Sequence, residues 1–156
     1  MTADSHREIE RKFLVRKLPE DLATYPASDI SQGYLVSTDD GLQVRLRKKD
    51  EQYSLTYKCG IGNVREEREI TLSAEQFSTL WPATESKRLI KTRYRIPLGN
   101  RTVEIDLYHS RHEGLVVAEV EFDDEQSARA FEPPDWLGED VTGDPRYSNQ
   151  LLASQA

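Results

Sequence analysis

The sequence predicts a mainly β (α+β) protein, namely a closed antiparallel barrel of about eight strands with a few flanking helices. Short runs of alternating apolar and polar residues follow one another along the chain, and short polar turns separate them. Strands joined by short turns pair antiparallel, and closure of the sheet removes its exposed edges. At 156 residues the chain has the size of one domain, so we expect residues 1–156 to form a single unit.

Each predicted strand rests on this alternation. In residues 42–48, Val44 and Leu46 share one face while Arg45 and Arg47 share the other. A polar turn then leads to a similar run at residues 53–58, which predicts a hairpin. By the same pattern the predicted strands cover residues 8–15, 30–37, 42–48, 53–58, 64–72, 89–98, 102–107 and 116–122.

Three short helices are predicted outside these strands. Ser73 and Gln76 have the spacing of a capping box, and Pro82 ends the helical segment, so we expect a helix over residues 74–81. A second helix is expected over 124–131, before Pro133 and Pro134, and a third over 148–154.

The composition is polar for a chain of this size, with 37% hydrophobic and 31% charged residues. Either a charged internal cavity or a very polar surface would explain it. The net charge of −7 argues against nucleic-acid binding through a basic surface. No apolar stretch approaches the ~20 residues that a membrane span needs. The first residues do not resemble a signal peptide, so we expect a cytoplasmic protein, with its oligomeric state left open.

Like charges recur two residues apart on the predicted strands. A solvated strand face usually mixes its signs, because like neighbours destabilise a sheet. One interpretation keeps apolar side chains inside the barrel and charges outside. The other lines a hydrated tunnel with the charged faces and packs the apolar faces outward, and a barrel of about eight strands can hold one small ligand. The pairs are Glu8/Glu10, Arg45/Arg47, Glu67/Glu69, Lys91/Arg93, Glu104/Asp106 and Glu119/Glu121.

A set of motifs that covers nearly the whole chain appears in one order. It begins with Glu8-x-Glu10-x-Lys12 and continues with Gln32-Gly33-Tyr34-Leu35, Arg45-Leu46-Arg47, Lys58, Glu67-Arg68-Glu69, Lys91-Thr92-Arg93-Tyr94, Glu104-Ile105-Asp106, Glu119-Val120-Glu121 and Arg146-Tyr147-Ser148-Asn149. This ordered set resembles the CYTH superfamily, also called triphosphate tunnel metalloenzymes, and in particular its small bacterial inorganic tripolyphosphatases. The resemblance favours the charged tunnel as the interior of the barrel.

The resemblance also implies an activity, which is metal-dependent hydrolysis of a triphosphate, above all of inorganic tripolyphosphate to diphosphate and phosphate. Alternatives are an adenylate cyclase or a nucleoside or thiamine triphosphatase of the same superfamily, or a polyphosphate-binding module without catalysis. The expected partner is a small-molecule polyphosphate, with no nucleic acid and no membrane. Phosphoryl transfer depends on positioning and electrostatics, so no Ser, Cys or His nucleophile is required.

The same resemblance assigns roles to individual residues. The guanidinium fork suits phosphate oxygens, and hard carboxylate ligands suit Mg²⁺ or Mn²⁺. The expected phosphate-binding residues are Arg45, Arg47, Lys58, Lys91, Arg93 and Arg146. The expected metal ligands are Glu8, Glu10, Glu69, Asp106, Glu119 and Glu121, and the expected catalytic group is Lys12 with Glu8 and Glu10. For Glu67 and Glu104, metal binding and a structural or tunnel-electrostatic role are both left open. Tyr34 is left between the tunnel mouth and ordinary packing.

Overall fold

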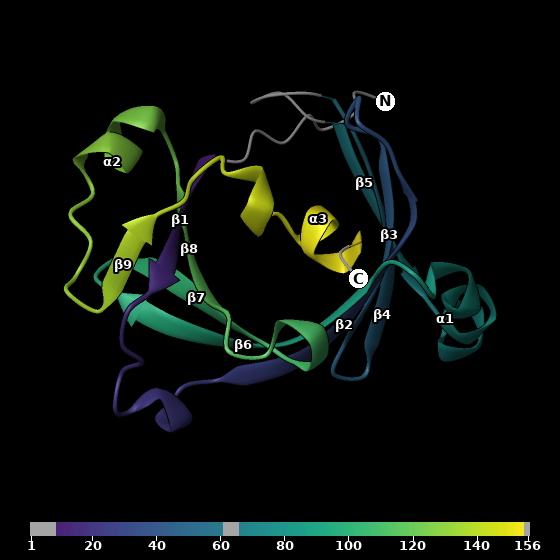
Figure 1. Ribbon diagram of the computed structural model, residues 1–156, viewed down its shortest axis with the longest axis horizontal. Helices are drawn as coiled ribbons and strands as arrows, with labels where there is room; N and C mark the ends of the chain where they lie inside the picture. The colour runs from purple at the N-terminus through teal and green to yellow at the C-terminus, as the bar shows by residue number, and fades with distance from the viewer. Residues whose placement is uncertain (1–8, 61–65, 155–156) are drawn as a thin grey trace.

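A computed structural model describes residues 9–60 and 66–154 and contains one nine-stranded antiparallel sheet (Figure 1). Its strand order is β5-β4-β3-β2-β6-β7-β8-β1-β9. The strands are β1 (Ile9–Val15), β2 (Ala27–Ser37), β3 (Gln43–Lys49), β4 (Gln52–Cys59), β5 (Glu66–Leu72), β6 (Arg88–Leu98), β7 (Arg101–Tyr108), β8 (Val116–Phe122) and β9 (Leu137–Asp140). The α-helices are α1 (Ala74–Leu80), α2 (Glu125–Ala130) and α3 (Asn149–Ser154), and the 3₁₀ turns are η1 (Leu22–Thr24), η2 (Trp81–Thr84), η3 (Ser110–His112) and η4 (Pro145–Tyr147).

The eight predicted strands and three predicted helices are all present, with small shifts at their ends. The capping box of α1 forms as expected, since the Ser73 hydroxyl accepts from the Gln76 amide N–H and the Gln76 side chain accepts from the Ser73 N–H. Residues 64 and 65 of the fifth predicted strand lie outside the described residues. In this part of the chain no helix has the length and hydropathy that crossing a membrane requires.

The prediction of a closed barrel is not confirmed, because the hydrogen-bonded sheet stays open between β5 and β9. β9, a strand absent from the predicted set, has four residues and pairs only with β1, with a register shift between Phe13 and Val15. In Figure 1 the sheet curves around α3, which lies inside the curve. The open edge at β5 carries the inward-facing charges of Glu67 and Glu69, and such charges discourage edge-to-edge pairing.

The strand register decides which side chains share the concave face. Residues directly opposite each other in an antiparallel pair point to the same side of the sheet. Arg45, Thr56 and Glu69 are opposite one another across β3, β4 and β5, and Lys12 is opposite Glu119 across β1 and β8. These charged residues therefore lie inside the curve, as the tunnel interpretation predicts.

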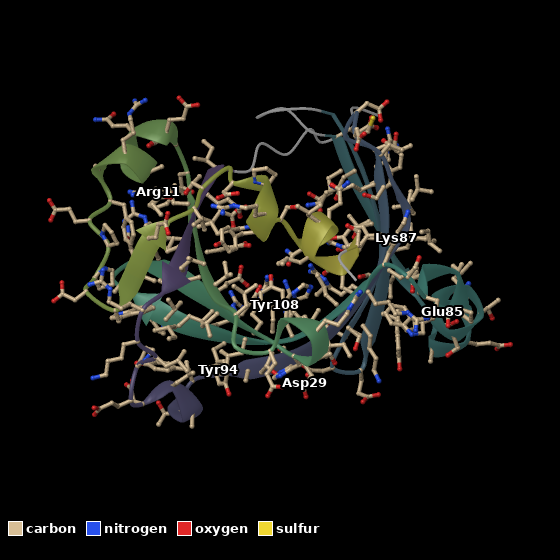
Figure 2. The ribbon with its side chains drawn as sticks, viewed as in Figure 1. Arg11, Asp29, Glu85, Lys87, Tyr94 and Tyr108 are labelled. Atoms are coloured by element: carbon tan, nitrogen blue, oxygen red, sulfur yellow. The ribbon has the colours of Figure 1, made fainter. Side chains whose placement is uncertain are left out.

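The apolar faces of the same strands pack outward against the helices. Under α1, a small core contains Leu46, Leu72 and Phe77. Under α2 and β9, a larger core contains Phe13, Leu22, Ile96, Val103, Ile105, Ala118, Val120, Phe122, Ala128 and Leu137. Figure 2 shows Tyr108 on the inner side of the sheet and Tyr94 on its outer side.

Arg11 is a charged residue of β1 that points outward instead (Figure 2). Its Nη1 donates to the carbonyl oxygens of Ala128 (3.0 Å) and Phe131 (2.9 Å) at the end of α2. Its Nε and Nη2 donate to the Asp140 carboxylate at 3.2 and 2.9 Å. Arg11 thus fastens α2 and β9 to β1, and its neighbours Glu10 and Lys12 point to the other face.

The helix α3 covers one end of the concave face. Leu152 and Ala153 are buried there against Tyr34, Leu89, Tyr108 and Val117. At the C-terminal end of the helix, the carbonyl oxygen of Leu152 is hydrogen-bonded to the His112 ring (2.6 Å). The inside of the sheet is therefore apolar where α3 packs and charged beyond it.

Candidate active site

A cavity of about 570 Å³ opens on the charged part of the concave face. It lies between two walls of the curved sheet, and the segment that leads into α3 forms its rim. Its described charged residues are Glu10, Lys12 and Glu119 on the β1 and β8 side, Arg45, Lys58 and Glu67 on the β3, β4 and β5 side, and Glu125 and Asp144 near the rim. Tyr34 also lines the cavity, so its orientation, which the sequence left open, is toward the interior.

Lys12 projects from β1 into this cavity. Its Nζ lies 3.5 Å from Glu119 Oε1 and donates to the carbonyl oxygen of Tyr147 at 3.1 Å. About 15% of each side chain in the Lys12–Glu119 pair is exposed. The ammonium group is thus held in a defined position, with a carboxylate on one side and the rim segment on the other.

Arg45 faces Lys12 from the opposite wall. Its Nη2 is 3.4 Å from Thr56 Oγ1, and that hydroxyl donates to Glu69 Oε1 at 2.9 Å. Its Nε is buried and has no hydrogen-bond partner among the described residues. A buried donor without an acceptor costs about 1–3 kcal/mol, so Arg45 offers an unused donor where an anion could accept it.

Arg47 follows on the same face of β3. Its Nε and Nη2 both donate to the Gln32 side-chain oxygen, at 2.9 and 2.8 Å. Burial, together with the positive charges of Arg45 and Arg93, lowers the pKa of Arg47 to about 10. No ion pair within the described part of the chain joins Arg45 or Arg47 to a carboxylate.

Lys91, Arg93 and Asp106 form a buried cluster deeper along the concave face. Asp106 receives Lys91 Nζ at 2.8 Å and the Nε and Nη2 of Arg93 at 2.7 and 2.9 Å. The Lys91 side chain is 0% exposed and that of Asp106 is 2% exposed. Both oxygens of Asp106 are thereby occupied by cations.

These contacts set the ionisation of the cluster. Burial lowers the pKa of Lys91 to about 8, although Asp106 opposes this change. Burial alone would raise the pKa of Asp106, but the charges of Lys91 and Arg93 outweigh it and hold that pKa well below its usual range. Burial also opposes the charge of Arg93, and its bond to Asp106 more than compensates, so its pKa is raised.

The remaining acidic residues gather on β7, β8 and β1. Glu10 is directly opposite Glu121, and Glu104 is directly opposite Glu119. Arg93 lies 3.4 Å from Glu104 and partly balances that pair. Directly opposed carboxylates repel each other unless a cation joins them, so this acidic surface suits a cation chemically.

The predicted metal ligands that lie among the described residues do not converge on one point. In residues 9–60 and 66–154, no three acidic, His or Cys side chains come together as a metal-binding group. Glu8 lies outside the described residues. Asp106 is occupied by Lys91 and Arg93, while Glu69 lies on the opposite wall and accepts from Thr56. Glu10, Glu119 and Glu121 remain as neighbours on adjacent strands.

The predicted phosphate-binding residues divide by position. Arg45 and Lys58 line the cavity, and Lys58 lies 3.9 Å from Glu67. Arg146 is separate from the others, since its side chain is 70% exposed and its Nη2 is paired with Asp144 at 2.6 Å. Arg47, Lys91 and Arg93 lie on the same face but outside the lining of this cavity.

Two polar residues of the site, Gln32 and Thr56, received no individual role from the sequence, whereas Asn149 belongs to the C-terminal motif that the resemblance places at one end of the tunnel. Gln32 and Thr56 are fully buried on the concave face and hold the two arginines of β3. Asn149 begins α3, and its side-chain oxygen accepts from Lys91 Nζ (3.3 Å) and from the Tyr108 hydroxyl (2.5 Å). Thr56 lies two residues from Lys58 on one strand face, and Gln32 belongs to the motif Gln32-Gly33-Tyr34-Leu35; these were the signals that the sequence offered.

Comparison with known proteins places these features in a family. Residues 6–148 match the family model described as the CYTH domain. The inorganic triphosphatase of Nitrosomonas europaea is 44% identical over 149 residues, which cover 94% of this chain and 96% of that protein. The inorganic triphosphatase of Acetivibrio thermocellus is 36% identical over 151 residues, which cover 94% and 92%.

Solved structures agree with these sequence comparisons. A crystal structure of an inorganic triphosphatase superposes with a TM-score of 0.78 at 41% identity and covers 97% of both chains. The structure of a putative adenylate cyclase from Bacillus halodurans has a TM-score of 0.58 at 18% identity and covers 80% of this chain and 85% of that chain. At that identity, the second similarity concerns the fold alone.

Proposed function

This chain belongs to the CYTH domain family, and we propose that it hydrolyses inorganic tripolyphosphate to diphosphate and phosphate with the help of a divalent cation. The two relatives named above are both inorganic triphosphatases and align with nearly the whole chain. The order of the motifs from Glu10 to Asn149 supports the same activity.

The observation that carries the proposal is that Arg45 and Arg47 form no ion pair with a carboxylate among the described residues. Arg45 has a buried donor without a partner among the described residues, and Arg47 is held by a neutral amide. Lys12 and Lys58 face the same cavity. A tripolyphosphate is a chain of closely spaced negative charges, and distributed cations in a partly desolvated site bind such a chain strongly.

For the metal we propose Mg²⁺ or Mn²⁺, held by Glu10, Glu119 and Glu121, with Glu8 of the same motif as a further ligand. Their carboxylates are hard oxygen donors, as these ions prefer, and the opposed pair Glu10 and Glu121 favours a cation. When bound, the ion supplies Lewis acidity that withdraws charge from the phosphoryl oxygens. Asp106 and Glu69 serve better as partners of Lys91, Arg93 and Thr56.

The chain's own residues then position the substrate and balance its charge. Arg45 and Lys58 bind phosphate oxygens from one wall, and Lys12 binds them from the other. Because Lys12 lines the cavity, its Nζ also donates a proton to the leaving phosphate in this proposal. Arg47, Lys91 and Arg93 add positive potential from deeper in the face. Phosphoryl transfer requires this positioning and electrostatic stabilisation rather than a protein nucleophile.

The absence of a base-stacking surface among the described residues favours tripolyphosphate over nucleotides. Tyr34 is the one aromatic residue among those that line the described part of the cavity, and it is 2% exposed. The Tyr53 ring packs against the tilted Phe77 ring on the outer face, with 5.1 Å between the ring centroids, and Tyr94 packs against the outer core. A site that selects a nucleoside needs groups that recognise the base or the ribose.

Phosphate release from a panel of substrates tests this proposal. The purified protein is assayed with tripolyphosphate, diphosphate, ATP and thiamine triphosphate, each with Mg²⁺, with Mn²⁺ and with excess chelator. We expect fast metal-dependent release from tripolyphosphate, slow release from ATP and no cyclic AMP. Faster turnover of ATP than of tripolyphosphate, or a cyclic product, contradicts the assigned substrate. Undiminished turnover in excess chelator contradicts the metal requirement.

A further inference from the structure

We propose that Gln32 is a positioning residue that keeps the charge of Arg47 available to the triphosphate and turns the proton of the Tyr34 hydroxyl toward the cavity. The inference rests on the proposed function, since it concerns how the same site binds its substrate. Gln32 is 0% exposed and does not line the cavity, so it can act only through the side chains that it holds.

The orientation of the Gln32 amide follows from its neighbours. A guanidinium group only donates hydrogen bonds, so the amide oxygen must face Arg47, and its two contacts there are 2.9 and 2.8 Å. The amide nitrogen then faces Tyr34 and donates to its hydroxyl oxygen at 2.8 Å. Because this oxygen already accepts a bond, the hydroxyl proton is free to point toward another acceptor, and Tyr34 lines the cavity.

Arg93 shows how an arginine of the same sheet face is held when its hydrogen-bond acceptor carries a charge. Arg93 is held along the same edge, through Nε and Nη2, but its acceptor is the carboxylate of Asp106, at 2.7 and 2.9 Å. Among the described residues a carboxylate therefore pairs with Arg93, whereas the side chain that holds Arg47 is neutral. A glutamate at position 32 could make the same two bonds while cancelling the charge that an anionic substrate needs.

The tests are Gln32→Glu, which adds a charge with little change of shape, and Gln32→Met, which removes both polar groups at similar length. Gln52→Glu, at the exposed start of β4, is the matched control for the added charge. Tripolyphosphate binding is measured by calorimetry without metal, and the melting temperature of the ligand-free protein is measured in parallel.

We expect Gln32→Glu to raise the dissociation constant for tripolyphosphate roughly tenfold to a hundredfold, with an equal or higher melting temperature. Gln32→Met should weaken binding less, because Arg47 keeps its charge, and should lower the melting temperature, because the guanidinium group loses its acceptor. Gln52→Glu should resemble the wild type.

The inference is overturned if Gln32→Glu binds as tightly as the wild type, or no more weakly than Gln32→Met. It is also overturned if Gln32→Glu loses binding only together with its thermal stability, because Gln32 would then serve the fold alone. If the wild type itself neither binds nor hydrolyses tripolyphosphate, the proposed function fails first, so the two failures are distinguishable.

Discussion

Asp106 is the anion on which two buried cations depend. Asp106→Asn keeps the shape but removes the carboxylate that is paired with the fully buried Lys91. We expect the free energy of unfolding near neutral pH to fall by about 3 kcal/mol, as for other broken buried ion pairs. Urea denaturation measures this loss, and Asp135→Asn, on an exposed segment, is the control. Equal stability of the two variants would show that the cluster contributes little.

The same carboxylate gives a pH dependence whose sign follows from its pKa. The pKa of Asp106 in the folded protein lies below the ordinary value of a free aspartate, because Lys91 and Arg93 overcome the effect of burial. The ionised Asp106 therefore stabilises the fold fully when the pH is above the pKa of Asp106 in the unfolded chain. This stabilisation is lost as the pH falls toward the lower pKa of Asp106 in the folded protein. The stability gap between the wild type and Asp106→Asn should narrow in acid, and a gap that widened there would contradict this assignment.

The lowered pKa of Lys91 predicts that the affinity for tripolyphosphate falls in alkaline solution. Burial lowers its pKa to about 8, so the free protein loses this positive charge as the pH rises through that value. Without metal, the wild type should bind tripolyphosphate more tightly than Lys91→Met at about pH 7, and the difference should shrink by about pH 9. Comparing the two proteins removes the titration of the ligand itself. A difference that does not change with pH would refute the prediction.

At the scale of elements, the two faces of β1 have separate tasks. Glu10 and Lys12 face the cavity, while Arg11 holds α2 and β9 on the outer side. Arg11→Lys cannot reproduce the planar fork, so we expect a loss of about 1–2 kcal/mol in the free energy of unfolding. The KM for tripolyphosphate should stay unchanged in this variant. Arg129→Lys, on the exposed side of α2, controls for the substitution. A large rise in KM without loss of stability would place Arg11 in the site.

Alternation along the sequence was sufficient to predict eight strands, because most of them have one apolar and one charged face. β9 was not predicted because a four-residue strand after Pro133 and Pro134 offers too little alternation. Helix α3 was predicted over the correct residues, but its position inside the sheet depends on contacts with Tyr34 and Tyr108, which lie far from it in sequence.

The partners of individual charges were harder to predict than their location. The register that places Arg93 opposite Asp106 decides that this arginine is balanced, and no local pattern contains that register. Arg146 belongs to a motif of the resemblance, yet Asp144, two residues before it, holds it at the surface. The open barrel has the same cause, since closure depends on how the two ends of the sheet meet.

For the whole molecule, the strand order places most basic residues of the concave face near the middle of the sheet and most acidic ones nearer its ends. The basic residues of β3 and β6 flank β2, and the acidic residues of β5 on one side and of β7 and β8 on the other lie beyond them. The outer face has two of the apolar cores, and the third lies under α3 on the concave face. Charges that would destabilise an ordinary sheet are thus concentrated on one concave surface, where substrate and metal can balance them.

The central claim is that this concave face, and not the outer face, binds and hydrolyses the triphosphate. Arg45 and Lys48 lie three residues apart on β3 and on opposite faces of the sheet. Arg45 faces the cavity, whereas the ammonium group of Lys48 lies 5.9 Å from the centroid of the outward-packed Tyr53 ring. The decisive measurement is kcat/KM for tripolyphosphate in Arg45→Ala and Lys48→Ala. We predict a fall of roughly a hundredfold or more for Arg45→Ala and little change for Lys48→Ala. Equal effects, or a larger effect of Lys48→Ala, would contradict the account.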